Sequence, residues 1–100
     1  MSLSHVRAVN LPTELLRNFT LIVDAGSMVR ATGGALVSQS ALSLQMKRLE
    51  DLVQTPLFAR KGRRLTLTPA GESMLAYARE ILTANDRAVQ ALREIRAAVA

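Results

Sequence analysis

The side chains that could do chemistry in this chain are mostly cations, and they are concentrated in one stretch. Between residues 30 and 64 the sequence holds seven basic and two acidic residues, whereas basic and acidic residues cancel over the rest of the chain. The whole formal net charge of +5 therefore belongs to that stretch. A charge that only kept the protein soluble would be spread out, so this pattern predicts a surface that binds a polyanion such as nucleic acid.

Groups for catalysis or metal binding are scarce. The chain has no cysteine, which excludes disulfides and thiolate metal sites. It has a single histidine, His5. The sequence contains no pair of carboxylates, no metal-ligand spacing and no phosphate-cradling loop, and Gly33-Gly34 is too short for a nucleotide-binding fingerprint. The sequence therefore predicts a binding protein that is not an enzyme and that uses no cofactor and no metal.

A helix predicted over residues 39–54 has the two faces that a DNA-reading helix needs. Its apolar stripe consists of Leu42, Met46, Leu49 and Val53, and its opposite face is mostly small and polar. Small side chains let the backbone approach the bases, glutamine can pair with an adenine edge, and serine can bond to any base. We therefore predict base contacts from the exposed face, with an ordinary solvated face as the alternative. The predicted residues are Gln39, Ser40, Ser43 and Leu44.

Leu44 is the apolar member of this face. Its side chain could meet a thymine methyl group, or it could fold back against the preceding helix. The sequence leaves both possibilities open.

Four cations surround a tight hairpin predicted at Lys61-Gly62-Arg63-Arg64, between short strands at 57–60 and 65–67. Such a tip can straddle the DNA backbone or enter the minor groove, and a turn that is charged only for solubility is the alternative. The start of a second helix, near Ser27, offers free N–H groups for a phosphate. The predicted contacts to the DNA backbone are Ser27, Arg30, Ser38, Lys47, Arg48, Arg60, Lys61, Arg63 and Arg64.

These residues need a helical frame to bring them together. Hydrophobic residues make up 49% of the chain but aromatic ones only 3%, so the core must be aliphatic, which suits packed helices. The pattern predicts helices at 13–25, stopped by Gly26, and at 28–35, then a turn at Leu36 and Val37, then the helix that Pro56 ends. Three helices and a hairpin in this order predict a mainly α fold, a winged helix-turn-helix over residues 12–68, after an N-terminal tail at 1–11.

Thr68 and Pro69 predict the start of a long linker helix over residues 69–100. Apolar residues recur along it with heptad spacing, which predicts pairing with the same helix of a second chain. A helix on a membrane surface and an intramolecular coil are the alternatives, and the mixed charges of the polar face argue against the membrane. The predicted dimer interface is Met74, Ala78, Ile81, Leu82, Asn85, Ala88, Val89, Leu92 and Ile95.

The stretch from Leu15 to about Leu75 resembles the DNA-binding domain of LysR-type transcriptional regulators. The resemblance is carried by Phe19 with Ala25-Gly26-Ser27, Ser38-Gln39-Ser40-Ala41-Leu42-Ser43, Arg48-Leu49-Glu50, Leu57-Phe58-Ala59-Arg60, Gly62-Arg63-Arg64 and Leu67-Thr68-Pro69-Ala70-Gly71. It implies a winged helix-turn-helix and a linker helix that makes the dimer. It also implies that Gln39, Ser40 and Ser43 face bases while the wing arginines face the backbone.

The chain departs from this family at several positions. The family usually has proline at Ser40, often arginine or another polar residue at Leu44, and glycine at Gln54, while Gly33 and Gly34 replace common helix formers. These differences bear on base preference rather than on the fold.

Full-length members of the family carry a C-terminal effector-binding domain, which we expect to be missing from this chain. We therefore expect a piece of a longer regulator, with a natural short form as the alternative, that binds no effector ligand by itself. A tetramer is an expectation for the full-length protein.

The sequence thus predicts a homodimer that binds double-stranded DNA sequence-specifically in the bacterial cytoplasm, at the nucleoid. No apolar run approaches the length of a membrane span, and residues 1–11 have no apolar signal core. The alternative is a winged-helix protein-interaction module without sequence-specific DNA binding, which an apolar Leu44 would suit.

Overall fold

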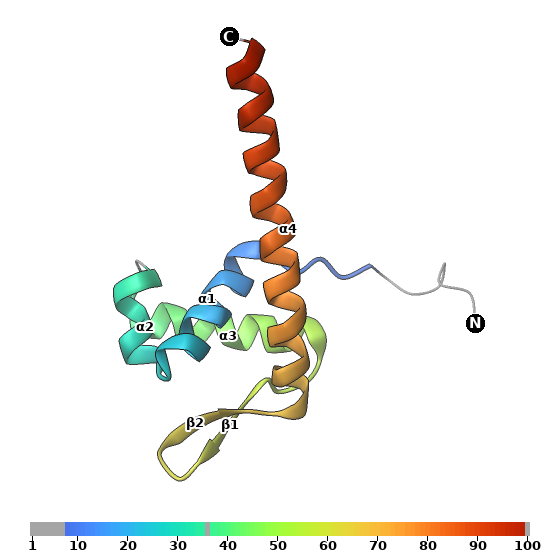
Figure 1. Ribbon diagram of the computed structural model, residues 1–100. Coiled ribbons are helices and arrows are strands. Elements are labelled where there is room, and N and C mark those ends of the chain that lie inside the picture. The colour runs from blue at the N-terminus through green and yellow to red at the C-terminus, as the bar shows by residue number, and fades with distance from the viewer. Residues whose placement is uncertain (1–7, 36, 100) are drawn as a thin grey trace, which may run out of the picture.

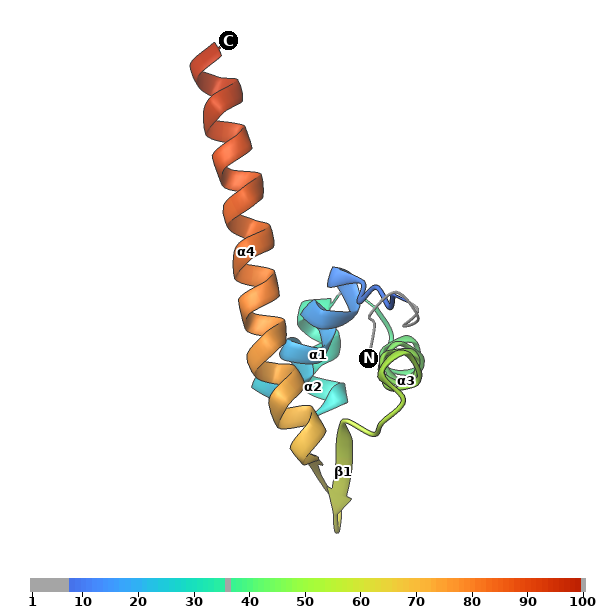
Figure 2. The same ribbon diagram turned by 90° about the vertical axis from the view of Figure 1, so that its right-hand side faces the viewer.

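The computed structural model describes residues 8–35 and 37–99, and these fold into helices and one hairpin (Figure 1). The elements are α1 (Thr13–Ala25), α2 (Met28–Ala35), α3 (Gln39–Val53), β1 (Phe58–Lys61), β2 (Arg64–Leu67) and α4 (Pro69–Val99). Helices α1 to α3 form a body, the hairpin projects from one end, and α4 runs past the body and far beyond it (Figures 1 and 2). The predicted mainly α fold, a winged helix-turn-helix with a long final helix, is confirmed.

Leu11, which the sequence assigned to the N-terminal tail, packs partly against the hydrophobic core. The tail residue His5 and the predicted turn residue Leu36 lie outside the described residues.

The hydrophobic core lies where α1 meets the other helices. Helix α1 contacts α2, α3 and α4, and so it is the central element of the body. The ring of Phe19 in α1 also packs against that of Phe58 in β1, with centroids 5.3 Å apart, which ties the hairpin to the body. The buried core residues are Leu15, Leu16, Phe19, Ile22, Ala31, Leu42, Met46, Leu49, Leu57, Met74, Ala78 and Leu82.

Local caps set the helix boundaries of the helix-turn-helix. Gly26 ends α1 in the left-handed conformation, with φ of 82°. The Ser27 hydroxyl accepts a hydrogen bond from the N–H of Arg30 at 3.1 Å, and the Ser38 hydroxyl accepts one from the N–H of Ala41 at 3.1 Å. Gly26, Ser27 and Ser38 therefore act as the sequence predicts.

Helix α3 ends at Val53, within one residue of the predicted end, but for a different reason. Gln54 takes the left-handed conformation with φ of 57°, and its N–H donates to the carbonyl of Glu50. Pro56 follows two residues later, outside the helix. The helix is therefore closed by a left-handed cap at a non-glycine residue, and proline only prevents its continuation.

The hairpin is antiparallel and tightly closed. Phe58 pairs with Leu67 and Lys61 with Arg64, so the turn consists of Gly62, with φ of 65°, and Arg63. Strand β1 lies one residue later than predicted and β2 begins one residue earlier, and Leu57 belongs to the core instead of the sheet.

The start of α4 is locked onto the strand entry at Leu57. The Leu57 carbonyl accepts a hydrogen bond from the N–H of Thr68 at 3.0 Å. The Thr68 hydroxyl accepts a hydrogen bond from the N–H of Gly71 at 3.0 Å and donates one to the carbonyl of Pro56 at 2.7 Å. Gly71 is buried directly against the Leu57 carbonyl, where no side chain fits. The direction of α4 is thus set by its first turn.

Helix α4 changes its environment along its length. Met74, Ala78 and Leu82 are buried in the core of their own chain, which corrects the prediction that they belong to a dimer interface. Their spacing matches a heptad seam because any helix packed on a neighbour buries the same period. From residue 86 to residue 99 every side chain is exposed. None of the described helices, α4 included, is both long enough and apolar enough to cross a membrane.

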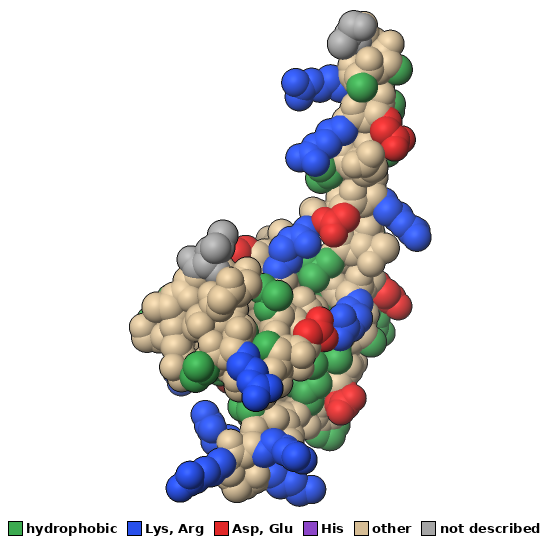
Figure 3. Space-filling view, turned by 60° about the vertical axis from the view of Figure 1, so that its left-hand side comes forward, with side chains coloured by type: hydrophobic (Ala, Val, Ile, Leu, Met, Phe, Trp, Pro, Cys, Tyr) green, Lys and Arg blue, Asp and Glu red, His purple; other side chains and the backbone are tan. Residues whose placement is uncertain are grey.

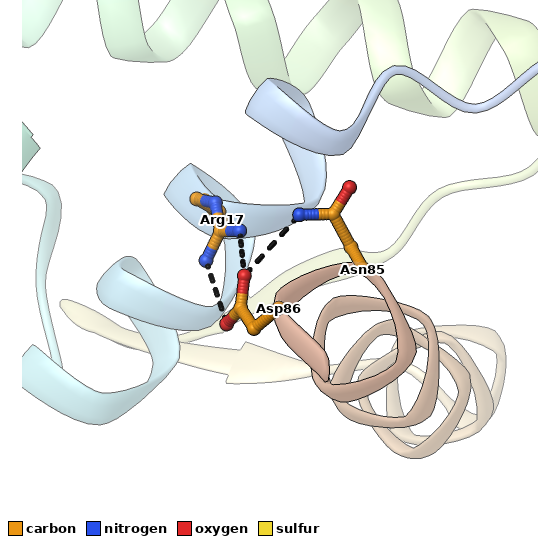
Figure 4. Close-up of polar contacts among 3 residues, drawn as sticks. All are labelled: Arg17, Asn85 and Asp86. Atoms are coloured by element: carbon orange, nitrogen blue, oxygen red, sulfur yellow. Dashed lines mark hydrogen bonds and ion pairs between the residues drawn. The ribbon is translucent and has the colours of Figure 1, made fainter. Parts of the chain in front are cut away.

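Two ion pairs join α4 to α1, and Figure 4 shows the one between Arg17 and Asp86. Arg17 of α1 donates to both carboxylate oxygens of Asp86, and Asn85 donates to the same carboxylate at 3.2 Å. The hydrogen bond from Arg17, and then that from Asn85, lowers the pKa of Asp86. Arg79 donates to Asp24 at 2.8 Å. These four charges are exposed, so they contribute more to the orientation of α4 than to stability.

Candidate nucleic-acid interface

The face of α3 that is turned away from the core is open to solvent. All four predicted base-contact residues are exposed: Gln39, Ser40, Ser43 and Leu44. Leu44 is 69% exposed, so it does not fold back against α2, which was one of the two possibilities. The buried face of the helix consists of Leu42, Met46 and Leu49, as expected.

A groove separates the exposed face of α3 from the hairpin. It is lined from the α3 side by Ser43, Lys47 and Glu50 and from the hairpin side by Arg60 and Leu65, among others. Helix and hairpin therefore present polar and basic side chains to the same space, although they are distant in the sequence. A double-helical ligand can contact both at once.

A second groove joins the hairpin to the start of α2. Gly26, Ser27 and Gln39 line it together with three hairpin arginines. The first N–H groups of α2 lie at this end of the helix and add positive partial charge to the site. The three arginines are Arg60, Arg63 and Arg64.

The remaining predicted contact residues lie outside the two grooves. Arg30, Arg48 and Lys61 are exposed but line neither groove. The Ser38 hydroxyl caps α3 and lies 3.2 Å from the hydroxyl of Ser40. The structure therefore brings together Ser27, Gln39, Ser43 and Lys47 with the wing, and leaves the others at its margins.

Basic side chains gather over the β1–β2 hairpin, at the lower end of the space-filling view, whereas basic and acidic side chains are mixed along α4 (Figure 3). The stretch from Gln39 to Leu49 contains no acidic residue. The cations of the hairpin and of α3 outnumber the carboxylates beside them, Glu50 and Asp51, and this excess of positive charge is suited to a polyanion.

Glu50 is the residue of this region whose function the sequence did not reveal. Its carboxylate accepts hydrogen bonds from the N–H groups of Leu57 at 2.7 Å and Phe58 at 3.3 Å. It thereby satisfies two backbone donors at the entry to β1 and joins the hairpin to α3. Its place in the basic stretch and in the motif Arg48-Leu49-Glu50 gave no indication of these bonds.

A hydrogen bond between two side-chain amides joins α3 to α1. The Asn18 side chain, which is 6% exposed, donates from Nδ2 to Oε1 of Gln45. Buried amides need a partner, and this bond sets the rotation of α3 on α1. The sequence placed Asn18 on a predicted helix but gave no sign of its partner.

Comparison with known proteins agrees with this geometry. Residues 13–72 match the family of bacterial regulatory helix-turn-helix proteins of the lysR family. The chain is 46% identical over 80 residues to the HTH-type transcriptional regulator DgdR of Burkholderia cepacia, which covers 80% of this chain and 27% of that protein. It is 44% identical over 84 residues to the HTH-type transcriptional regulator PecT of Dickeya dadantii, covering 84% of this chain and 27% of that protein.

Solved structures show the same arrangement of helices and wing. The BenM DNA-binding domain in complex with catB site 1 DNA matches with a TM-score of 0.80 and 28% identity, covering 85% of this chain and 96% of that chain. CbnR, a LysR family transcriptional regulator, matches with a TM-score of 0.78 and 32% identity, covering 83% of this chain and 29% of that chain. The chain spans about a quarter of the length of the curated relatives that it matches. It belongs to the lysR family of bacterial regulatory helix-turn-helix proteins and has the fold of that family's DNA-binding domain.

Proposed function

We propose that this chain binds double-stranded DNA sequence-specifically, with α3 in the major groove and the hairpin on the backbone or in the minor groove. The observation that carries the proposal is the groove in which Ser43 and Lys47 of α3 face Arg60 of the hairpin. The BenM domain with the same fold is solved as a DNA complex. A regulator of this kind acts on the chromosome, in the bacterial cytoplasm.

The position of each side chain decides whether we assign it to the bases or to the phosphates. Gln39, Ser40, Ser43 and Leu44 read bases from the exposed face of α3, whose N-terminal part usually reaches the groove floor in such motifs. The phosphates are bound by the N-terminus of α2 and by cations around the two grooves. Those groups are Ser27, Arg30, Ser38, Lys47, Arg48, Arg60, Lys61, Arg63 and Arg64.

Selection of binding sites from a random duplex library, with the purified chain, tests this proposal. We expect an enriched, two-fold symmetric site. Gln39→Ala should lower the affinity for that site by about 1–3 kcal/mol, because a bidentate contact to a base edge is lost. Its affinity for a scrambled duplex should stay unchanged, since non-specific binding rests on phosphate contacts. Specific binding that survives both Gln39→Ala and Ser43→Ala would refute the assignment of α3 to the groove.

We also propose that the chain is a homodimer held together by the exposed part of α4. After the core contacts end, apolar side chains continue along one side of the helix without cover from their own chain: Leu92 is 67% exposed and Ile95 60% exposed. A stripe of this kind is buried in a symmetric partner, where each contact occurs twice. The proposed interface consists of Ile81, Asn85, Ala88, Val89, Leu92 and Ile95.

Ile95→Asp is expected to weaken dimerisation by about 3–6 kcal/mol, because two copies of a buried isoleucine are lost per dimer. Sedimentation equilibrium at micromolar concentration should then show a monomer, whereas the unchanged chain should show a dimer. Ala97→Asp introduces the same charge on the opposite side of the helix and is expected to leave the dimer intact. A wild-type monomer, or an Ile95→Asp dimer of unchanged stability, would contradict the proposed interface.

The exposed Leu44 favours one second candidate, a protein-interaction module whose winged helix does not read DNA. Such a module would show little affinity for any duplex at low salt.

A further inference from the structure

The most unusual side chain on the proposed DNA-facing surface is Leu44. It is 69% exposed, and in the described part of the chain nothing covers it. Two residues correspond to about 200° of helix rotation, so Leu44 lies nearly opposite the buried Leu42. It therefore lies near the middle of the exposed face of α3.

The neighbours of Leu44 allow it to approach a base. Ser40 lies one turn before it on the same side of α3, and Ser43 lies beside it; both are small. Lys47 and Arg48 follow within the next turn and are exposed cations suited to the flanking phosphates. No acidic side chain between residues 39 and 49 would repel the DNA from this face.

The only apolar group that the bases present in the major groove is the C5 methyl group of thymine. Guanine, adenine and cytosine present hydrogen-bond donors and acceptors there, whereas thymine also presents its C5 methyl group. A leucine pressed against donors and acceptors alone would remove them from water without bonding to them, which is unfavourable. Leu44 therefore gains free energy only where a methyl group faces it.

We propose that Leu44 is a specificity-determining residue that recognises the C5 methyl group of one thymine in each half-site. This inference rests on the proposed function, since it requires α3 in the major groove. Because 5-methylcytosine carries its methyl group at the same ring position, the same side chain discriminates methylated from unmethylated cytosine at that position.

The test uses the enriched duplex with its thymines replaced one at a time by deoxyuridine, which lacks only the methyl group. For the wild-type chain, affinity should fall about fourfold at one thymine per half-site and about fifteenfold when both half-sites are changed, on the scale of one buried methyl group. In Leu44→Ala the same replacements should have no effect. The other thymines serve as internal controls, and circular dichroism should show unchanged helix content because Leu44 is exposed.

A second duplex places cytosine or 5-methylcytosine at the sensitive position. The wild-type chain should prefer the methylated form about fourfold and Leu44→Ala should not, because one buried methyl group is gained. The inference is overturned if the half-site contains no thymine, if no deoxyuridine replacement lowers affinity, or if the loss persists in Leu44→Ala. If the library yields no enriched site, or if no duplex is bound at low salt, the proposed function is overturned and this inference with it. Such a result would point to a protein partner for the Leu44 face.

Discussion

Gly71→Ala is expected to lower the free energy of unfolding by about 3 kcal/mol, a large share of the total stability of a domain of this size. A Cβ at this position would overlap the carbonyl oxygen of Leu57 and lie 3.0 Å from Cδ2 of Leu67. The obstructing group is backbone, and its oxygen is already held by the N–H of Thr68. Relief therefore requires the first turn of α4 to move away from the hairpin.

Urea denaturation followed by circular dichroism measures this loss as a lower transition midpoint. Gly33→Ala is the matched control: Gly33 lies in α2, and a Cβ there would meet nothing within 4 Å. That substitution should stabilise the protein by about 0.5–1 kcal/mol, through the higher helix propensity of alanine. If Gly71→Ala and Gly33→Ala shift the midpoint alike, the contact between α4 and Leu57 is not what positions the helix.

Removal of both arginines at the hairpin tip, in the double variant Arg63→Ala with Arg64→Ala, is expected to weaken DNA binding about a hundredfold at low salt. Each charge-assisted hydrogen bond to a phosphate contributes about 1.5 kcal/mol, which is roughly tenfold in affinity. The loss should be similar for the enriched and the scrambled duplex, since phosphates are common to both. The slope of log affinity against log salt concentration should become less steep by about 2.

The double variant Arg87→Ala with Arg93→Ala removes the same charge from the far part of α4, where both arginines are exposed. It should leave affinity nearly unchanged at moderate salt, because these positions are far from the grooves and their field is screened. Equal losses in the two double variants would show that total charge, rather than the hairpin, binds the duplex. A loss confined to the enriched duplex would assign the hairpin to base reading.

The features that the sequence predicted well are determined within a few residues. Gly26, Ser27, Ser38 and Thr68 cap or end helices through bonds to backbone groups no more than four residues away, so the sequence pattern alone reveals them. The exposed face of α3 was equally predictable, because helical periodicity separates it from Leu42, Met46 and Leu49.

The features that were missed depend on contacts between segments that are distant in the sequence. Glu50 bonds to the N–H groups of Leu57 and Phe58, and Gly71 is required by the Leu57 carbonyl. Neither relation exists until the hairpin and α4 have folded back on α3. The sequence could not show, for a related reason, which part of the heptad stripe is covered by the chain itself. Met74, Ala78 and Leu82 share their period with the exposed apolar residues further along, and only the position of α1 decides which are already covered.

The central claim is that the α3 face and the hairpin together make a sequence-specific DNA-binding surface. Its most direct test is the affinity of the unmodified chain for the enriched duplex and for a scrambled duplex of equal length, at low and at physiological salt. The claim predicts that both duplexes bind with a steep salt dependence, and that the enriched one binds about a thousandfold more tightly or better at physiological salt. Equal affinity for the two duplexes at every salt concentration would contradict it and leave a basic module held by phosphates alone.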